Sequence, residues 1–252
     1  MNLLLARPWE IESDGILQIT GVRRDHLANV VGVTPQSQIR IGFPDSCQGM
    51  GVVDSVGDSI RIRHELNPAD PPDSPTPLIH IILAMPRPKV LGRILSHMAA
   101  LGVASIRLVR SWHVEKSYLQ TDLTKESKSR ELLLDGLEQA RDTRVPQFEV
   151  FPLFRPFVED ELDRKLPHSK RILAHPTDAS PMAKAMIGRS DSVVIAIGPE
   201  RGWTPFECDL LAEHGFERVS LGARILRVET ALTAAVSQVQ LLQSMAALAE
   251  DQ

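Results

Sequence analysis

The sequence has few residues of several kinds, and each shortage excludes a class of protein. Only two of the 252 residues are cysteines, Cys47 and Cys208, and they lie far apart without metal-ligand spacing. A disulfide framework and a zinc site are therefore not indicated, and we expect no metal. The N-terminal segment has neither a basic leader nor an apolar run long enough for a signal peptide or a membrane span. We therefore expect a cytoplasmic protein without a membrane segment.

Positive charge is also scarce in the first part of the chain. Residues 1–75 contain six arginines and no lysine against ten acidic residues, and the whole chain has a formal net charge of -4. A protein that coats nucleic acid needs positive potential, so any RNA contact must come from clustered arginines. The hydrophobic fraction of 43% and the charged fraction of 24% are those of a globular protein with a sizeable core.

The N-terminal third reads as short strands. Residues 38–43 and 59–64 alternate apolar and polar side chains, and residues 23–33 form a candidate short helix among the strands. A small β-barrel over residues 1–68 fits this pattern. The segment that follows, 69–77, belongs to a stretch too rich in proline for a helix or a central strand, and we interpret it as a domain linker.

Residues 78–252 have a different pattern, in which apolar strands alternate with helices. Such alternation predicts an α/β domain with a parallel sheet covered on both faces. The predicted strands are 78–84, 105–109, 171–174, 192–197 and 218–221, and the predicted helices lie around 91–101, along Leu133, Leu137 and Ala140, from Thr204, and over about 229–249.

The stretch "IAIGPERGWTPFE" (195–207) combines an apolar strand with a glycine turn. Thr204 is placed to cap the helix that follows, which puts the turn at the carboxyl end of a strand, where open α/β sheets bind ligands. The spacing of Gly198 and Gly202 fits neither a dinucleotide fingerprint nor a P-loop. The two glycines predict close approach of the backbone to a flat ligand. The alternative is an ordinary turn with solvated charges.

A second loop, in "VSLGARILRVETALTAA" (219–235), repeats this arrangement. A strand ends in a turn at Gly222, and Arg224 and Arg227 follow, three residues apart. In a helical or 3₁₀ turn their guanidinium groups would lie on one side, where they could hold an anionic group. The alternative is that both pair with nearby acids such as Glu229.

Together these loops resemble the C-terminal motifs of the RsmE-type 16S ribosomal RNA uridine N3-methyltransferases of the SPOUT superfamily. "RRDHLANVV", "MAALGV" and "EQARDTRVP" resemble further stretches of that family, in the same order along nearly the whole chain. The resemblance implies a PUA-like RNA-binding β-barrel followed by an α/β-knot methyltransferase domain with a C-terminal trefoil knot. It also implies a homodimer that uses S-adenosylmethionine to methylate uridine N3 in 16S rRNA or the small ribosomal subunit.

The resemblance implies a set of site residues as well. Those expected to bind the cofactor are Leu173, Ala174, Ile197, Gly198, Pro199, Glu200, Gly202, Leu221, Gly222, Leu226 and Arg227. Candidate RNA contacts, for which solvated charge is the alternative interpretation, are Arg7, Arg23, Arg24, His26, Lys89 and Arg144.

Methylation of uridine N3 requires the imide proton to leave and the resulting anion to be stabilised. Arg224 and Arg227 are the candidates for stabilising the anion, and Glu200 or Glu229 for accepting or orienting the proton. Arg201 replaces a glycine of the family motif, which suggests a divergent paralogue. A catalytically silent or retargeted RNA-binding protein is therefore the alternative, and the failed fingerprint counts against a nicotinamide enzyme.

Several other side chains have two interpretations. Trp112 and Trp203 are able to stack on bases, but packing in the core or at its rim is the default for such side chains. His175 comes at a strand end before a proline, where a structural role in the turn is favoured.

Overall fold

The computed structural model describes residues 2–12 and 15–250. The chain divides into two compact units, which are Met1–Thr76 with Leu134–Val145, and Pro77–Leu133 with Pro146–Gln252. The first boundary falls at the end of the proline-rich segment. Helix α3 (Glu126–Ala140) is shared, because its second half and the loop after it belong to the first unit. The sequence does not predict that residues 134–145 belong to the first unit, because the helical pattern there continues the α/β alternation of the second unit.

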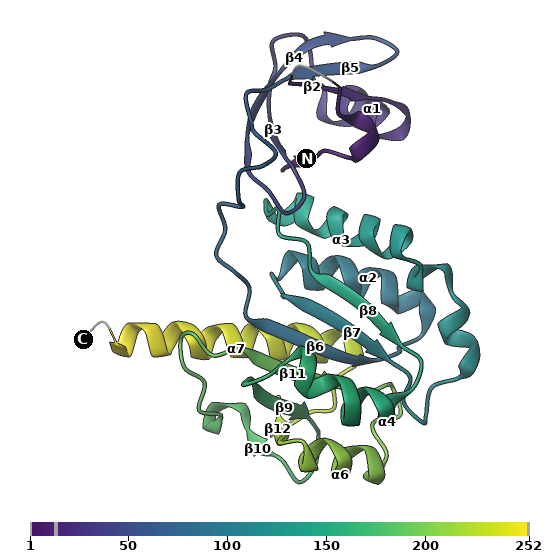
Figure 1. Cartoon of the computed structure of the whole chain (residues 1–252), viewed down its shortest axis with the longest axis vertical. Coiled ribbons are helices and arrows are strands. Elements are labelled where there is room, and N and C mark those ends of the chain that lie inside the picture. Colours follow the sequence, from purple (N-terminus) through teal and green to yellow (C-terminus); the bar gives the residue numbers. More distant parts are fainter. Residues whose placement is uncertain (1, 13–14, 251–252) are drawn as a thin grey trace. The chain divides into compact units, whose positions relative to one another are not determined.

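The first unit contains a five-stranded sheet in the order β1-β3-β4-β5-β2 (Figure 1). All neighbouring pairs are antiparallel except β1 and β3, which are parallel. The strands are β1 (Leu4–Leu5), β2 (Ile16–Ile19), β3 (Gln38–Gly42), β4 (Gln48–Val56) and β5 (Ile60–Arg63). Short strands are observed where the sequence predicts them, whereas the small β-barrel and its likeness to a PUA domain stay predictions.

Alternation places the core of this unit on one face of the sheet. Ile60 and Ile62 of β5 are fully buried, as the pattern of their segment predicts. The predicted short helix is also present, as α1 (Gly21–His26) followed by the π turn η2 (Leu27–Val31). It ends at Gly32, whose φ of 74° lies in the left-handed region that glycine adopts readily.

The second unit contains a parallel seven-stranded sheet in the order β10-β12-β9-β11-β6-β7-β8. Its strands are β6 (Ile79–Ala84), β7 (Ser105–Val109), β8 (Gln147–Phe151), β9 (Lys170–Ala174), β10 (Ser180–Pro181), β11 (Val193–Ile197) and β12 (Glu217–Ser220). The five strands predicted from apolar runs are all present. Strands β8 and β10 were not predicted, because β8 is only half-buried and β10 has two exposed residues, so neither is a continuous apolar run.

Helices cover this sheet on both faces (Figure 1). Val194 and Ala196 of β11 pack against the short helices after β8 and against α6, while α7 contacts the same strand from the other face. The longer helices are α2 (Pro88–Ala100), α6 (Pro205–Glu213) and α7 (Val228–Glu250). The short helices and turns are η1 (Pro8–Glu10), η3 (Lys116–Gln120), η4 (Asp122–Thr124), α4 (Phe154–Pro156), η5 (Phe157–Glu161), α5 (Leu162–Lys165) and η6 (Met182–Lys184).

Helix α7 is the one helix in the described part of the chain whose length and composition match those of a membrane span, with a mean hydropathy of 1.2 over its best window. Of that window 22% is buried inside the structure, on one face of the first part of the helix. The buried residues of that face are Val228, Leu232, Ala235, Val236 and Val239.

Candidate functional site

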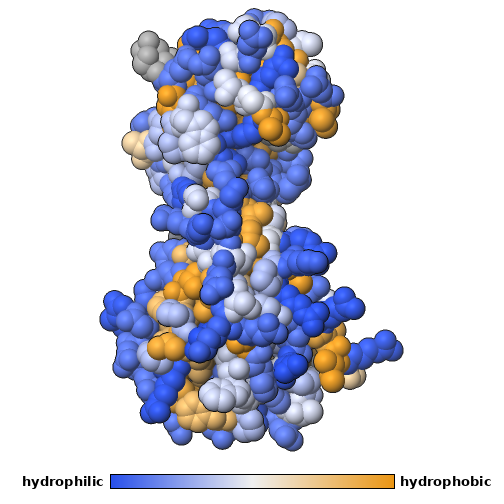
Figure 2. Space-filling model, turned by 90° about the vertical axis from the view of Figure 1, so that its right-hand side faces the viewer, coloured by the Kyte–Doolittle hydropathy of each residue, from blue (hydrophilic) through white to orange (hydrophobic). Residues whose placement is uncertain are grey.

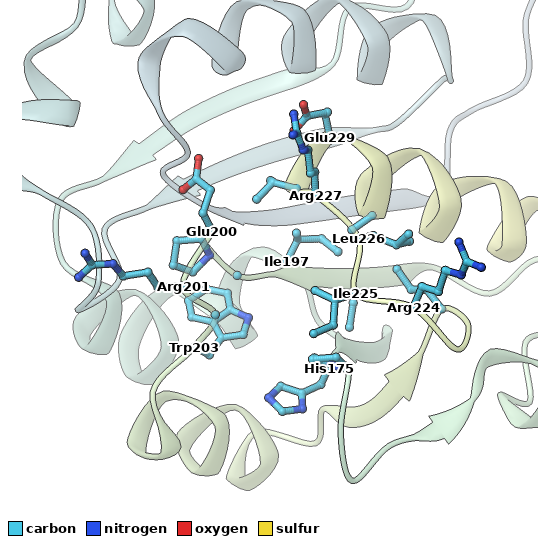
Figure 3. Close-up of a pocket in the computed structure, with 18 of the residues that line it drawn as sticks. His175, Ile197, Glu200, Arg201, Trp203, Arg224, Ile225, Leu226, Arg227 and Glu229 are labelled. Atoms are coloured by element: carbon cyan, nitrogen blue, oxygen red, sulfur yellow. The ribbon is translucent and has the colours of Figure 1, made fainter.

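A pocket of about 770 Å³ lies at the carboxyl ends of β9, β11 and β12 (Figure 3). Parallel strands direct their carboxyl ends to one edge of the sheet, so three loops far apart in sequence meet there. The lining residues are Arg87, Val90, Ala174, His175, Pro176, Ile197, Gly198, Pro199, Glu200, Arg201, Gly202, Trp203, Ser220, Leu221, Gly222, Arg224, Ile225, Leu226, Arg227, Val228, Glu229 and Ala231.

The loop after β11 is fixed by hydrogen bonds at both ends. The Gly202 N–H donates to the carbonyl of Pro199 at 2.8 Å, and the positive φ of Gly202, 74°, is one that side chains rarely adopt. Thr204 caps α6, and Glu207 completes the capping box that the sequence predicts. At Gly198 a Cβ would lie 3.1 Å from the indole of Trp203, a tight contact that would require Trp203 to shift. The shape of the turn therefore favours glycine at Gly202 by conformation and at Gly198 by close packing.

The loop after β12 differs from its expected form. Residues 221–227 form bends and irregular backbone before α7 begins, and Gly222 has a φ of 145°. The predicted helical or 3₁₀ turn is therefore wrong. Figure 3 shows the guanidinium groups of Arg224 and Arg227 directed to different sides of the loop rather than to one side. Both residues still line the pocket.

The pocket is lined by arginines whose positive charges have no partner within the described protein. Within residues 2–12 and 15–250, the guanidinium groups of Arg201, Arg224 and Arg227 have neither a hydrogen bond nor an ion pair, and all three residues are exposed. Glu229 instead lies 3.9 Å from Arg93. The alternative in which the two loop arginines pair with Glu229 is therefore not observed, and the pocket can accept an anionic group.

Glu200 is held in place by the start of the neighbouring helix. Its Oε1 accepts a hydrogen bond from the backbone N–H of Arg87 at 3.1 Å, just before α2 begins. Oε2 has no partner among the described residues. One oxygen therefore orients the carboxylate while the other remains available to a ligand.

One buried polar group of the pocket is left unsatisfied. Trp203 is only 7% exposed, and its Nε1–H has no hydrogen-bond partner in the described structure. Figure 3 shows this nitrogen on the side of the indole that is directed toward the interior of the pocket. An unsatisfied buried donor costs about 1 to 3 kcal/mol, so a ligand that supplies an acceptor would be favoured.

The structure gathers nearly all of the expected cofactor residues around this pocket. The exception is Leu173, which is fully buried in the core beneath the sheet and does not line the pocket. Strand alternation explains this correction, because Leu173 and Ala174 point to opposite faces. All four candidate catalytic residues line the pocket as well.

Sequence reasoning missed part of the lining. Arg87 and Val90 come from the segment before and within α2, and only the parallel pairing of β6 with β11 brings them to the pocket. His175 donates from Nδ1–H to the carbonyl oxygen of Thr177 at 2.7 Å within its own turn, and it also lines the pocket. Its position directly after a predicted strand was the available signal.

Three of the candidate RNA contacts bind to the protein itself. Arg7 is 2% exposed, with its guanidinium on the carbonyl of Leu5 and on Glu138, so burial corrects the expectation of a surface role. Arg23 binds Glu10 at 2.6 Å and Glu138 at 3.1 Å. The Nε of Arg144 donates to the carbonyl of Ser74 at 2.8 Å, within the first unit.

The other three candidates are closer to solvent. Arg24 donates to the carbonyl of Gly57 at 2.8 Å and pairs with Asp25, while His26 and Lys89 are exposed. His26 and Lys89 are therefore the two candidates that are exposed to solvent, and their contact with RNA stays a prediction.

The architecture defines a class of protein, namely an α/β domain with a ligand pocket made by glycine turns and unpaired arginines. Residues 72–240 match the family model described as an RNA methyltransferase domain. The chain belongs to this family of RNA methyltransferases.

Full-length relatives agree with this assignment. The chain is 31% identical to the ribosomal RNA small subunit methyltransferase E of Treponema pallidum over 244 residues, which cover 95% of the chain and 90% of the relative. It is 27% identical to ribosomal RNA small subunit methyltransferase E 1 of Borreliella burgdorferi, with 93% and 95% covered. In structure it resembles the Neisseria gonorrhoeae methyltransferase E bound to S-adenosylmethionine, with a TM-score of 0.74, 22% identity, and 96% and 98% covered.

Proposed function

We propose that this protein transfers a methyl group from S-adenosylmethionine to N3 of a uridine in 16S rRNA. The observation that carries the proposal is the pocket of the second unit, where two glycine turns meet the unpaired arginines Arg224 and Arg227 in a member of the RNA methyltransferase family. Relatives that match over nearly their whole length are named as methyltransferases of small-subunit ribosomal RNA.

The pocket fits S-adenosylmethionine by size and by polarity. Its volume of about 770 Å³ lies within the range of small-molecule sites. The unsatisfied Nε1–H of Trp203 and the glycine backbone provide donors for a ligand with many acceptors. Arg201 does not narrow this space, because Figure 3 shows its guanidinium directed away from the pocket. When bound, the cofactor would supply an electrophilic methyl group.

In the proposed reaction the pocket handles one proton and one developing negative charge. The uridine N3–H would give its proton to a carboxylate, and the N3 electron pair would form the new bond to the methyl carbon while the bond from that carbon to sulfur breaks and leaves its electron pair on the neutral thioether. Glu200 and Glu229 both line the pocket and are the candidate acceptors. Glu200 is oriented by the Arg87 N–H, which leaves Oε2 available for this role.

The loop arginines would stabilise the uridine anion. Because Arg224 and Arg227 have no protein partner in the described residues, a substrate anion would not have to displace an existing ion pair. Their different directions suggest separate roles, one at the base and one at a neighbouring phosphate. Arg227 lies next to Glu229 in the chain segment that begins α7, and we assign it to the base.

The domain organisation, the oligomeric state and the location of the protein are inferred from the same family resemblance. We infer a PUA-like first unit over about residues 1–68, a linker over 69–77, a trefoil knot in the methyltransferase domain of residues 78–252, a homodimer, and a cytoplasmic location. Exposed apolar residues late in α7 support self-association; they are Leu241, Met245 and Leu248.

The test is methyl transfer from labelled S-adenosylmethionine to unmodified small ribosomal subunits and to naked 16S rRNA, followed by mass spectrometry of nucleosides. We expect N3-methyluridine, and comparison of the two substrates gives the assembly requirement. Cofactor binding without transfer to either substrate would favour a retargeted enzyme. Absence of saturable cofactor binding would leave the silent RNA-binding protein as the better account.

A further inference from the structure

An exposed tryptophan lies beside the pocket and has no role in the mechanism above. Trp112 is 84% exposed, which is unusual for the side chain with the largest apolar surface. The sequence favours packing for this residue, and the structure contradicts that expectation. The backbone around the side chain is nevertheless ordered, since Val114 N–H donates to the Ser111 carbonyl at 3.1 Å and both residues are buried.

The turn that carries Trp112 is attached to the pocket loop. The Trp112 N–H donates to Oε1 of Glu207 at 2.8 Å, and the same buried carboxylate caps the first turn of α6 through Oε2. The next residue, His113, has its Nδ1 3.0 Å from the carbonyl oxygen of Gly202. Two hydrogen bonds therefore hold the turn against residues 202–207.

A second exposed aromatic side chain is one residue from the carboxylate that anchors this turn. Phe206 is 56% exposed and directly precedes Glu207, to which the Trp112 backbone is bonded. Arg201 directly precedes Gly202, is exposed, and lines the mouth of the pocket. We call Trp112, His113, Arg201 and Phe206 the aromatic rim. Figure 2 shows that hydrophobic surface on the face in view occurs as patches within a mostly hydrophilic exterior.

We propose that the aromatic rim binds unpaired nucleotides of the substrate RNA, next to the one whose base enters the pocket. This inference rests on the proposed function. Aromatic faces stack on any base, and a guanidinium binds phosphate or stacks in turn, so the rim has the composition of a single-strand RNA site. Its continuity with the pocket argues for the substrate, because a base presented for methylation leaves its neighbours unstacked.

The anchoring explains why the exposed rings can act in binding. The turn is already held by Glu207 and Gly202. Little backbone conformational entropy is therefore lost when a base stacks on Trp112. Neither ring contributes to the core of the unit. Substitutions there change the surface and leave the fold in place.

The experiment compares Trp112→Ala and Phe206→Ala with the parent protein. Measurements are equilibrium binding of unmodified 16S rRNA, the KM for small ribosomal subunits, and the KM for S-adenosylmethionine. We expect each variant to weaken RNA binding and to raise the subunit KM about tenfold, with the cofactor KM and the melting temperature unchanged. Trp112→Phe should retain most of the RNA affinity, because it keeps an aromatic face.

Met186→Ala is the matched control, since Met186 is equally exposed, at 84%, in the same unit and does not line the pocket. Unchanged RNA affinity in Trp112→Ala overturns the proposal, and so does a loss that Met186→Ala reproduces. A change in molecular mass by light scattering, with RNA affinity kept, assigns the rim to a protein contact and also overturns it. If the parent transfers no methyl group, the proposed function fails, while RNA binding still tests the rim.

Discussion

The arginines of the first unit and those of the pocket differ in what surrounds their guanidinium groups. Arg7 and Arg23 converge on Glu138, a residue more than 100 positions later in the chain, and Arg7 is almost completely buried. Arg224 and Arg227 have no side-chain partner within the described residues and face a pocket. The comparison teaches that the partners of an arginine distinguish its environments: the same side chain is neutralised by carboxylates inside one unit and has no protein partner at the pocket of the other.

Burial of the first cluster has an electrostatic consequence. Burial raises the pKa of the Glu138 carboxyl, and the nearby guanidinium groups of Arg23 and Arg7 oppose that rise. The two arginines therefore make an ionised Glu138 tolerable inside the unit. A guanidinium used in this way is not available to RNA.

Removing a pocket arginine is expected to have the largest effect on activity. Arg227→Ala should slow methyl transfer about 100-fold to 1,000-fold, because one donor to a developing anion contributes about 3 to 4 kcal/mol. The free energy of unfolding should change by less than about 0.5 kcal/mol, since the side chain is exposed. Single-turnover transfer at saturating cofactor measures the first quantity. Arg155→Ala, at an exposed ion pair on α4, is the control. Equal rates in Arg227→Ala and the parent would refute the role.

Removing a buried arginine should instead reduce stability. Arg7→Ala is expected to lower the free energy of unfolding by about 3 kcal/mol, because it leaves part of the buried charge of Glu138 without compensation. Urea titration followed by far-UV circular dichroism measures this change. The exposed Arg40 provides a control substitution to alanine. If Arg7→Ala is as stable as the parent but binds RNA more weakly, Arg7 contacts RNA and the structural role is wrong.

The second unit also contains a buried arginine, Arg107. Its neighbour His80 leads us to predict that the free energy of unfolding depends on pH. Burial, and then the charge of Arg107, lowers the pKa of His80 from 6.5 to about 4. The unfolded chain takes up a proton near pH 6.5 but the folded one only near pH 4, so stability should fall as the pH falls through this window. We expect a loss of about 2 kcal/mol, allowing for the partial exposure of the ring. Urea titrations at pH 7 and pH 4.5 measure it, and His80→Asn should reduce the loss. An identical pH dependence in the variant would contradict this account.

The smallest expected effect concerns the unsatisfied indole of the pocket. Trp203→Phe keeps an aromatic ring but removes Nε1–H, and it should weaken S-adenosylmethionine binding about fivefold to tenfold, or about 1 kcal/mol. Calorimetric titration of the cofactor measures this change. Trp9→Phe, in the other unit, should bind the cofactor as the parent does. If Trp203→Phe also binds with parental affinity, the indole does not contact the ligand.

Much of the second unit could be predicted from local patterns. Apolar runs identified five of its strands, and the Thr204 cap with Glu207 fixed the start of α6, because these signals depend on neighbours within a few residues. The loop after β12 was predicted incorrectly as a helical turn, because the spacing of Arg224 and Arg227 does not report the backbone at Gly222, whose φ of 145° no helical turn contains. The exposure of Trp112 was missed because burial depends on what packs around a side chain.

The sequence by itself determined the alternation of strands and helices, the two glycine turns, and the family to which the chain belongs, because each is encoded by residues close together. Tertiary structure alone decided which arginines are satisfied, that Leu173 lies in the core while Ala174 lines the pocket, and that Arg87 orients Glu200. These outcomes depend on groups up to 131 residues apart, as with Arg7 and Glu138. Electrostatic and packing energies depend on distance in space, and local sequence patterns do not carry that distance.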